Sequence, residues 1–129
     1  MPKYIIDSYA WVEYFIASDK GKQVKEIIES NKNEIFTSVI VIAEVMSISK
    51  RENMDAEQAY NTILGLSKIH YFDEKFAKEL GILHSEIRKK IKDFGMVDCL
   101  LLLTARKLGA KVVTGDPHFK DFKDVIFIG

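Results

Sequence analysis

Residues 97–119, VDCLLLLTARKLGAKVVTGDPHF, contain the pattern that decides the fold. Apolar residues at helical spacing predict a helix over Val97–Leu108 that ends at Gly109, a residue common just past helix C-termini. The next run, Lys111–Thr114, is typical of a buried strand. Because only a short turn joins the helix to the strand, the two should run antiparallel. The start of the helix, which contains Asp98, therefore lies near the carboxyl end of the strand.

Strand-like and helix-like segments alternate along the rest of the chain. Strands are predicted over Tyr4–Ile6, Ile35–Thr37, Ile69–Phe72, Lys111–Thr114 and Val125–Ile128. Helices are predicted over Ser8–Ala17, Gly21–Ser30, Val39–Lys50, Ala56–Ser67, Glu74–Ile91 and Val97–Leu108. Such alternation predicts an α/β fold in three layers, with helices on both faces of a mostly parallel sheet. The strand order is left open.

The composition indicates one globular domain over residues 1–129, with 47% hydrophobic and 29% charged residues. The formal net charge of zero argues against a protein that coats nucleic acid by bulk charge. A single cysteine, Cys99, excludes an internal disulfide and fits a reducing compartment. Asp7 interrupts the apolar start of the chain, which argues against a signal peptide, and no apolar run is long enough to cross a membrane. We therefore expect a soluble, cytoplasmic protein.

Four acidic residues from distant parts of the sequence are expected at one edge of the sheet. Asp7 directly follows the first strand, and Asp116 follows the fourth after one glycine. Glu44 lies in the second turn of the helix after the second strand, and Asp98 starts the last helix. Ligands of open α/β sheets bind at the carboxyl ends of the strands, so these four carboxylates are the candidate site.

Each aspartate also has a structural interpretation. Asp7 and Asp98 could be helix N-caps or first-turn acids, and Asp116 before Pro117 could start a turn. Glu44 is the only charged residue in the apolar stretch 35–48, where an isolated carboxylate would need a partner. Lys50 is poorly placed to be that partner. A bound cation would serve, and the alternative is a partly exposed glutamate paired with a distant Lys or Arg.

Four carboxylates at one site suit a divalent cation. Mg²⁺ and Mn²⁺ prefer oxygen ligands, and without a cation the acids would repel each other. Ser8 and Thr114 could orient these ligands or hold metal-bound waters, although serine also suits a cap and threonine a strand. His118 is either a substrate contact or a surface residue of its turn. The basic segments Lys50–Arg51 and Arg88–Lys92 are candidate RNA contacts or simply solvated helix faces.

These motifs resemble those of the PIN domain, and among its members the VapC-like toxins of toxin–antitoxin pairs. The segment YIIDSYAWVEYF is similar to the first motif of the family, and SVIVIAEV, centred on Glu44, to the second. Residues 97–119 resemble the third and fourth motifs, with Asp98, Thr114 and Asp116. The resemblance extends over essentially the whole chain, although residues 53–94 match only in pattern. Cys99 stands where the family often has alanine.

The resemblance implies a three-layer α/β/α sandwich with a parallel five-stranded sheet. It implies Mg²⁺- or Mn²⁺-dependent cleavage of RNA phosphodiesters by a metal-activated water. In that mechanism Asp7, Glu44 and Asp98 hold one ion, and Asp116 completes its shell or recruits a second ion. It also implies homodimers and inhibition by a small antitoxin.

Three other functions are alternatives to this one. A response-regulator receiver would have an acidic pair after the first strand, whereas Asp7 is followed by Ser8. A non-catalytic PIN-like module that binds RNA or protein remains an alternative, although all four acids are present. An RNA-processing nuclease that is not a toxin is a further alternative, which the sequence does not separate from a toxin.

Overall fold

A computed structural model describes residues 1–129 and shows a five-stranded sheet in the order β3-β2-β1-β4-β5. All four strand pairs are parallel. The strands are β1 (Lys3–Ile6), β2 (Glu34–Ser38), β3 (Lys68–His70), β4 (Lys111–Thr114) and β5 (Val125–Phe127). The helices are α1 (Ser8–Ile16), α2 (Asp19–Ile28), α3 (Val39–Arg51), α4 (Ala56–Leu66), α5 (Glu74–Arg88), α6 (Met96–Leu108) and the short 3₁₀ helix η1 (Pro117–Phe119).

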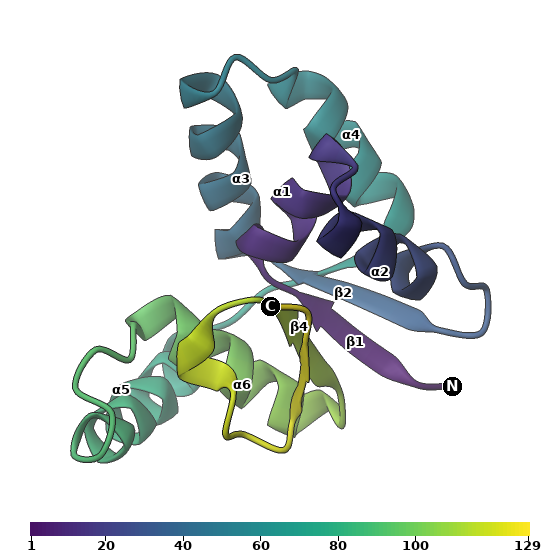
Figure 1. Ribbon diagram of the computed structural model, residues 1–129. Coiled ribbons are helices and arrows are strands. Elements are labelled where there is room, and N and C mark those ends of the chain that lie inside the picture. Colours follow the sequence, from purple (N-terminus) through teal and green to yellow (C-terminus); the bar gives the residue numbers. More distant parts are fainter.

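Helices cover both faces of this sheet. Figure 1 shows α1 to α4 on one face and α5 and α6 on the other. The central strands β1 and β4 are therefore buried from both sides, and Ile5, Ile6, Val112 and Val113 are fully buried. This explains why these strands are apolar without alternation. The α/β class, the three layers and the parallel five-stranded sheet are all confirmed.

A buried hydrogen bond shows which strand residues face which helices. The indole Nε1 of Trp11 in α1 donates to Thr37 Oγ1 in β2 over 3.1 Å. Thr37 therefore points toward the α1 side of the sheet. Successive side chains of a strand point to opposite faces, so Ser38 points toward the side of α5 and α6. His70, the partner of Ser38 in the β2–β3 ladder, points toward the same side. The centroid of its ring lies 6.0 Å from that of the Phe76 ring in α5.

Several predicted boundaries were wrong by a few residues. Helix α2 begins at Asp19 rather than Gly21, because the Ser18 hydroxyl accepts the Gly21 amide at 3.0 Å and caps the helix. Strand β3 ends at His70 rather than Phe72, because its ladder with β2 ends at the pair Ser38–His70. Helix α5 ends at Arg88 rather than Ile91. None of the helices combines the length and the hydropathy that a membrane span requires.

Candidate metal centre

The site lies at the carboxyl edge of the sheet. The ladder pairs Ile5 with Phe36 and with Val112. Two residues further along each strand are Asp7, Ser38 and Thr114, which therefore lie side by side on the face that α6 covers. The backbone amide of Asp7 donates to the Val113 carbonyl over 3.2 Å, which continues the β1–β4 pairing up to Asp7.

Asp7 is the buried member of the site, with only 5% of its surface exposed. Its Oδ1 accepts the Ala10 amide at 2.7 Å, so Asp7 is also the N-cap of α1. Burial raises the pKa of Asp7 to about 7; hydrogen bonds from Thr114 and Ala10 oppose the shift, and the charges of Asp98 and Asp116 add to it. The cap interpretation of Asp7 is therefore confirmed, and the same carboxylate is costly to ionise where it is buried.

Asp98 has a comparable double role at the start of α6. It occupies the third helical position after the N-cap residue Gly95, and the Gly95 amide hydrogen-bonds its carboxylate. Burial raises the pKa of Asp98 to about 6; the charge of Asp116 and a hydrogen bond between the two carboxyl groups raise it further. Two acids this close favour sharing a proton or binding a cation.

Asp116 is held by three contacts in the turn after β4. Its amide donates to Thr114 Oγ1 over 3.0 Å, and its Oδ1 accepts the His118 amide at 2.9 Å. The His118 Nδ1 lies 3.0 Å from the same oxygen. Asp116 is thus the N-cap of η1, with Pro117 at the first helical position, so the turn interpretation is also correct.

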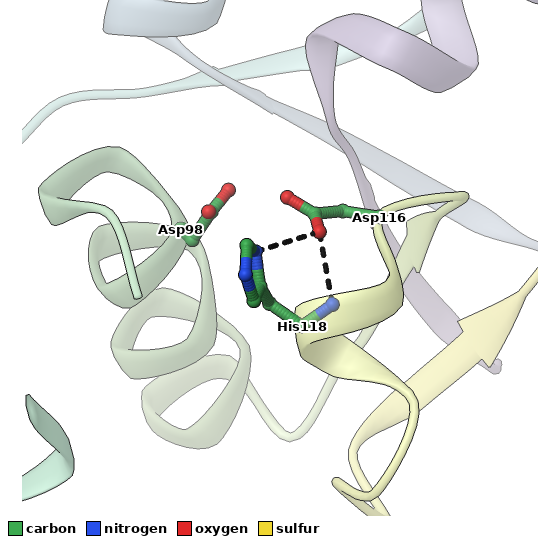
Figure 2. Close-up of side chains that lie close together, drawn as sticks. All are labelled: Asp98, Asp116 and His118. Carbon is green, nitrogen blue, oxygen red and sulfur yellow. Dashed lines mark hydrogen bonds and ion pairs between the residues drawn. The ribbon is translucent and has the colours of Figure 1, made fainter. Parts of the chain in front are cut away.

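Three of these side chains form a tight group. Ligand atoms of Asp98, Asp116 and His118 all lie within 4.8 Å of one another, and Figure 2 shows the Asp98 carboxylate pointing toward Asp116 from the facing helix. Asp7 is outside this tight group, but it is close enough that the charges of Asp98 and Asp116 raise its pKa. The group therefore brings together two of the four acids, Asp98 at the start of α6 and Asp116 after β4, together with His118.

Glu44 lies differently from the prediction. The apolar stretch 35–48 around Glu44 is not buried along its whole length. Glu44 is half-buried, and Ala43 and Ser47 on the same helix are exposed. It lines a hollow of about 350 Å³ together with Ser47 and Arg51. The premise of a carboxylate isolated on a buried surface was thus wrong, because α3 packs against the sheet with one side only. Burial still raises the pKa of Glu44, and a hydrogen bond with Ser8 opposes the shift.

The two hydroxyl residues singled out in the sequence both contact an acid. The hydroxyl of Ser8 hydrogen-bonds Glu44, and that of Thr114 hydrogen-bonds Asp7 while it accepts the Asp116 amide. Thr114 is completely buried. It contacts two acids from neighbouring strands, Asp7 after β1 and Asp116 after β4. His118 was the residue whose role the sequence left open; its position two residues after Asp116 in a turn was the available signal.

The donor set of this edge suits a divalent cation. It offers carboxylate oxygens from Asp7, Asp98 and Asp116 and one imidazole nitrogen. The pKa is raised at Asp7 and Asp98, chiefly by burial and further by the charges of the neighbouring acids. Carboxylate oxygens of this kind bind Mg²⁺ and Mn²⁺, whereas imidazole is more typical of zinc, copper, iron and nickel sites. A separate hollow of about 510 Å³ is lined by residues of α1, α2, α4 and their loops and by none of the four acids.

Comparison with known proteins agrees with the observed fold. Similar solved structures include a toxin–antitoxin complex from Klebsiella pneumoniae, with 22% identity, coverage of 98% of both chains and a TM-score of 0.73. VapBC2 from Rickettsia felis, bound to a DNA fragment from its promoter, is 25% identical over 97% of this chain and 96% of that chain, with a TM-score of 0.72. VapC20 from Mycobacterium tuberculosis, described as a sarcin-ricin loop cleaving toxin, is 16% identical over 84% and 85% of the two chains, with a TM-score of 0.67.

A search of curated protein sequences finds no match. The sequence profile of the PIN domain, in contrast, matches residues 4–125 and so includes all four acids. Together with the parallel sheet and the acidic edge, this match shows that the chain belongs to the PIN domain family.

Proposed function

We propose that this protein is an endoribonuclease that depends on a divalent cation, Mg²⁺ or Mn²⁺, and that hydrolyses RNA phosphodiester bonds. The observation that carries the proposal is the group formed by Asp98, Asp116 and His118, next to the buried Asp7. PIN domain membership supports a nuclease in general. Mg²⁺ or Mn²⁺ is proposed because a ligand set made mostly of carboxylates favours hard cations.

In this proposal Asp7, Asp98 and Asp116 would hold the cation. Glu44 would be a fourth ligand from α3, and its support is the hydrogen bond with Ser8, the residue next to Asp7. A divalent cation bound there would lower the pKa of a coordinated water and would neutralise the charge that develops on the phosphoryl group. Thr114 keeps Asp7 and Asp116 in a fixed relation, and Ser8 orients Glu44. Helix α6 presents Asp98 from the side of the sheet opposite to α1.

We further propose that the nuclease is the toxin of a toxin–antitoxin pair, acts in the cytoplasm and forms a homodimer. The support is structural similarity to a toxin–antitoxin complex and to VapBC proteins. A small antitoxin encoded by a neighbouring gene is the expected partner. Co-expression of the two genes should yield a complex that purifies as one species and cleaves RNA less than the free chain; the mass of the free chain in solution tests the dimer.

The nuclease is tested by incubating purified protein with structured and unstructured RNAs in Mg²⁺, Mn²⁺ or EDTA. Cleavage should require the cation and should fall at least 100-fold in Asp98→Asn, a loss typical of removing a group that stabilises charge in the transition state. Asp93→Asn is the matched control, because Asp93 is exposed and lies just before α6. Cleavage that survives both EDTA and Asp98→Asn would refute the proposal.

A non-catalytic module is the remaining candidate, and metal binding separates it from the nuclease. Calorimetric titration with Mn²⁺ should show one saturable site in the wild type that is lost in Asp98→Asn. A wild-type protein that binds neither Mn²⁺ nor Mg²⁺ and cleaves no RNA would favour the module. Binding of Mn²⁺ without cleavage would instead direct the search to a specific RNA target.

A further inference from the structure

Three buried side-chain atoms form no hydrogen bond: Ser38 Oγ, Ser49 Oγ and His70 Nδ1. Burying a polar atom without a partner costs free energy, so such atoms are rare in folded proteins and their position is informative. Ser38 and His70 are direct partners in the β2–β3 ladder, at the carboxyl edge of the sheet. Ser49 lies near the end of α3.

Ser38 sits where a helix cap would be expected, yet its hydroxyl does not cap. It is the N-cap residue of α3, with extended backbone angles, but forms no side-chain bond to the helix. The N-cap side chains Asp7, Ser18, Asp55 and Asp73 each accept a backbone amide of their helix. The Ser38 side chain, with 0% of the residue exposed, therefore contributes neither a cap nor a contact with water.

The position of Ser38 relative to Asp7 indicates what its hydroxyl is for. Both residues follow the ladder pair Ile5–Phe36 by two positions and point to the same face of the sheet. Adjacent strands are about 4.8 Å apart, so a serine and an aspartate side by side are within reach of a direct hydrogen bond after a small rotation of either side chain. Thr114 flanks Asp7 on the β4 side in the same way and does bond it.

A carboxylate that holds a cation keeps lone pairs that need hydrogen-bond donors. Asp7 receives one such bond from the Ala10 amide and one from Thr114. On its β2 side the nearest donor in the register is the Ser38 hydroxyl, which has no other partner.

We infer that Ser38 is a positioning residue of the metal centre, whose hydroxyl donates to the Asp7 carboxylate when that carboxylate holds the cation. The inference rests on the proposed metal-dependent function. Ser38 acts through Asp7, since it is completely buried and does not reach substrate. The pair Thr114 and Ser38 would then hold Asp7 from both neighbouring strands.

The test measures Mn²⁺ binding by calorimetry in the full chain, with Ser38→Ala, Ser38→Thr and the control Ser49→Ala. Ser49 is also a completely buried serine without a hydrogen bond, but it is not at the carboxyl edge. Ser38→Ala should weaken Mn²⁺ binding about tenfold, within the range for groups that orient metal ligands. Ser38→Thr keeps the hydroxyl and should restore most of the affinity, and Ser49→Ala should bind like the wild type.

Thermal unfolding without metal is the second measurement. Because neither serine hydroxyl forms a hydrogen bond within the protein, both alanine variants should unfold without metal at a temperature equal to or higher than that of the wild type. If Ser38 only supported the fold, Ser38→Ala would not weaken Mn²⁺ binding without also lowering the unfolding temperature measured without metal. His70→Leu should not change the affinity, because His70 is on the far side of Ser38 from Asp7.

The outcomes distinguish this inference from the proposed function. Wild-type affinity in Ser38→Ala, with binding lost in Asp98→Asn, would overturn the role of Ser38 alone. Equal losses in Ser38→Ala and Ser49→Ala, or in Ser38→Ala and His70→Leu, would also overturn it. Absence of Mn²⁺ binding in the wild type would contradict the proposed metal-dependent function and this inference with it.

Discussion

The Nδ1 atom of His118 lies 3.0 Å from Oδ1 of Asp116, and the His118 backbone amide donates to the same oxygen over 2.9 Å. Both contacts use one oxygen of the carboxylate, and Figure 2 shows the other oxygen directed toward Asp98. His118 thus orients Asp116 so that one oxygen remains available on the side where the second acid lies. Groups that hold a metal ligand in this way commonly affect metal affinity.

Replacing His118 by alanine should therefore weaken Mn²⁺ binding about tenfold and slow RNA cleavage at a fixed Mn²⁺ concentration by a similar factor. Calorimetry and a cleavage assay measure the two effects. Lys120→Ala is the control, because Lys120 is an exposed residue at the end of the same turn. Unchanged affinity in His118→Ala would mean that the backbone amide alone is sufficient to position Asp116.

The stability of the metal-free protein should fall as the pH rises from about 4 to 8. The folded-state pKa of Asp7, about 7, lies above its ordinary value of 3.8, so between these values the folded protein binds more protons than the unfolded chain. The shift corresponds to about 4 kcal/mol as an upper value for the contribution of Asp7. Asp98, with a pKa of about 6, adds to the same trend. Urea unfolding at a series of pH values measures it.

Asp7→Asn is the control for this pH dependence. The amide has the size of the protonated acid and does not ionise, so the loss of stability toward pH 8 should become smaller. Saturating Mn²⁺ should stabilise the wild type most at high pH, because the acids must be ionised to bind it. A wild-type protein whose metal-free stability rises steadily from pH 4 to 8 would contradict the burial of Asp7.

Gly115, between Thr114 and Asp116, should not tolerate a side chain. A Cβ atom there would overlap the ring of Tyr9, whose hydroxyl accepts a hydrogen bond from Lys20 Nζ at 2.9 Å. Gly115→Ala should cost about 1–3 kcal/mol of stability, as overpacking usually does, and should weaken Mn²⁺ binding by displacing Asp116. Thermal unfolding and Mn²⁺ calorimetry measure both effects. Wild-type behaviour would show that the Tyr9 ring moves aside freely. The control is Gly81→Ala, since Gly81 in α5 has open space.

Gly21 in α2 and Gly65 in α4 should respond to alanine in opposite directions. A Cβ at Gly21 would overlap the backbone carbonyl of Glu13 in α1, whereas a Cβ at Gly65 meets nothing within 4 Å. Gly65→Ala should stabilise the protein by up to about 1 kcal/mol through helix propensity. Gly21→Ala should destabilise it by more than that, because backbone atoms cannot move aside as a side chain can. Chemical denaturation compares the two; a stabilising Gly21→Ala would mean that α1 and α2 are packed less closely.

Local sequence signals predicted most of the fold. The last helix was placed within one residue of its start because its apolar spacing and Gly109 are local features, and Gly109 adopts the left-handed conformation at the C-cap. The end of β3 was misplaced because Tyr71 and Phe72 have strand propensity but no ladder partner. The strand order, with β1 between β2 and β4, depends on contacts between distant segments that no local signal contains.

By itself, the sequence determined which acids follow strands or begin helices, because strand, turn and cap signals act over a few residues. Only the tertiary structure decided which of these acids meet: α6 brings Asp98 to Asp116 and His118, whereas Glu44 lies on the half-exposed side of α3. It also showed that Asp7 caps α1 while its charge interacts with those of Asp98 and Asp116, and that the Ser38 hydroxyl has no hydrogen-bond partner. These relations depend on strand order and on the packing of helices across the sheet, and both are set by long-range burial rather than by the residues next in sequence.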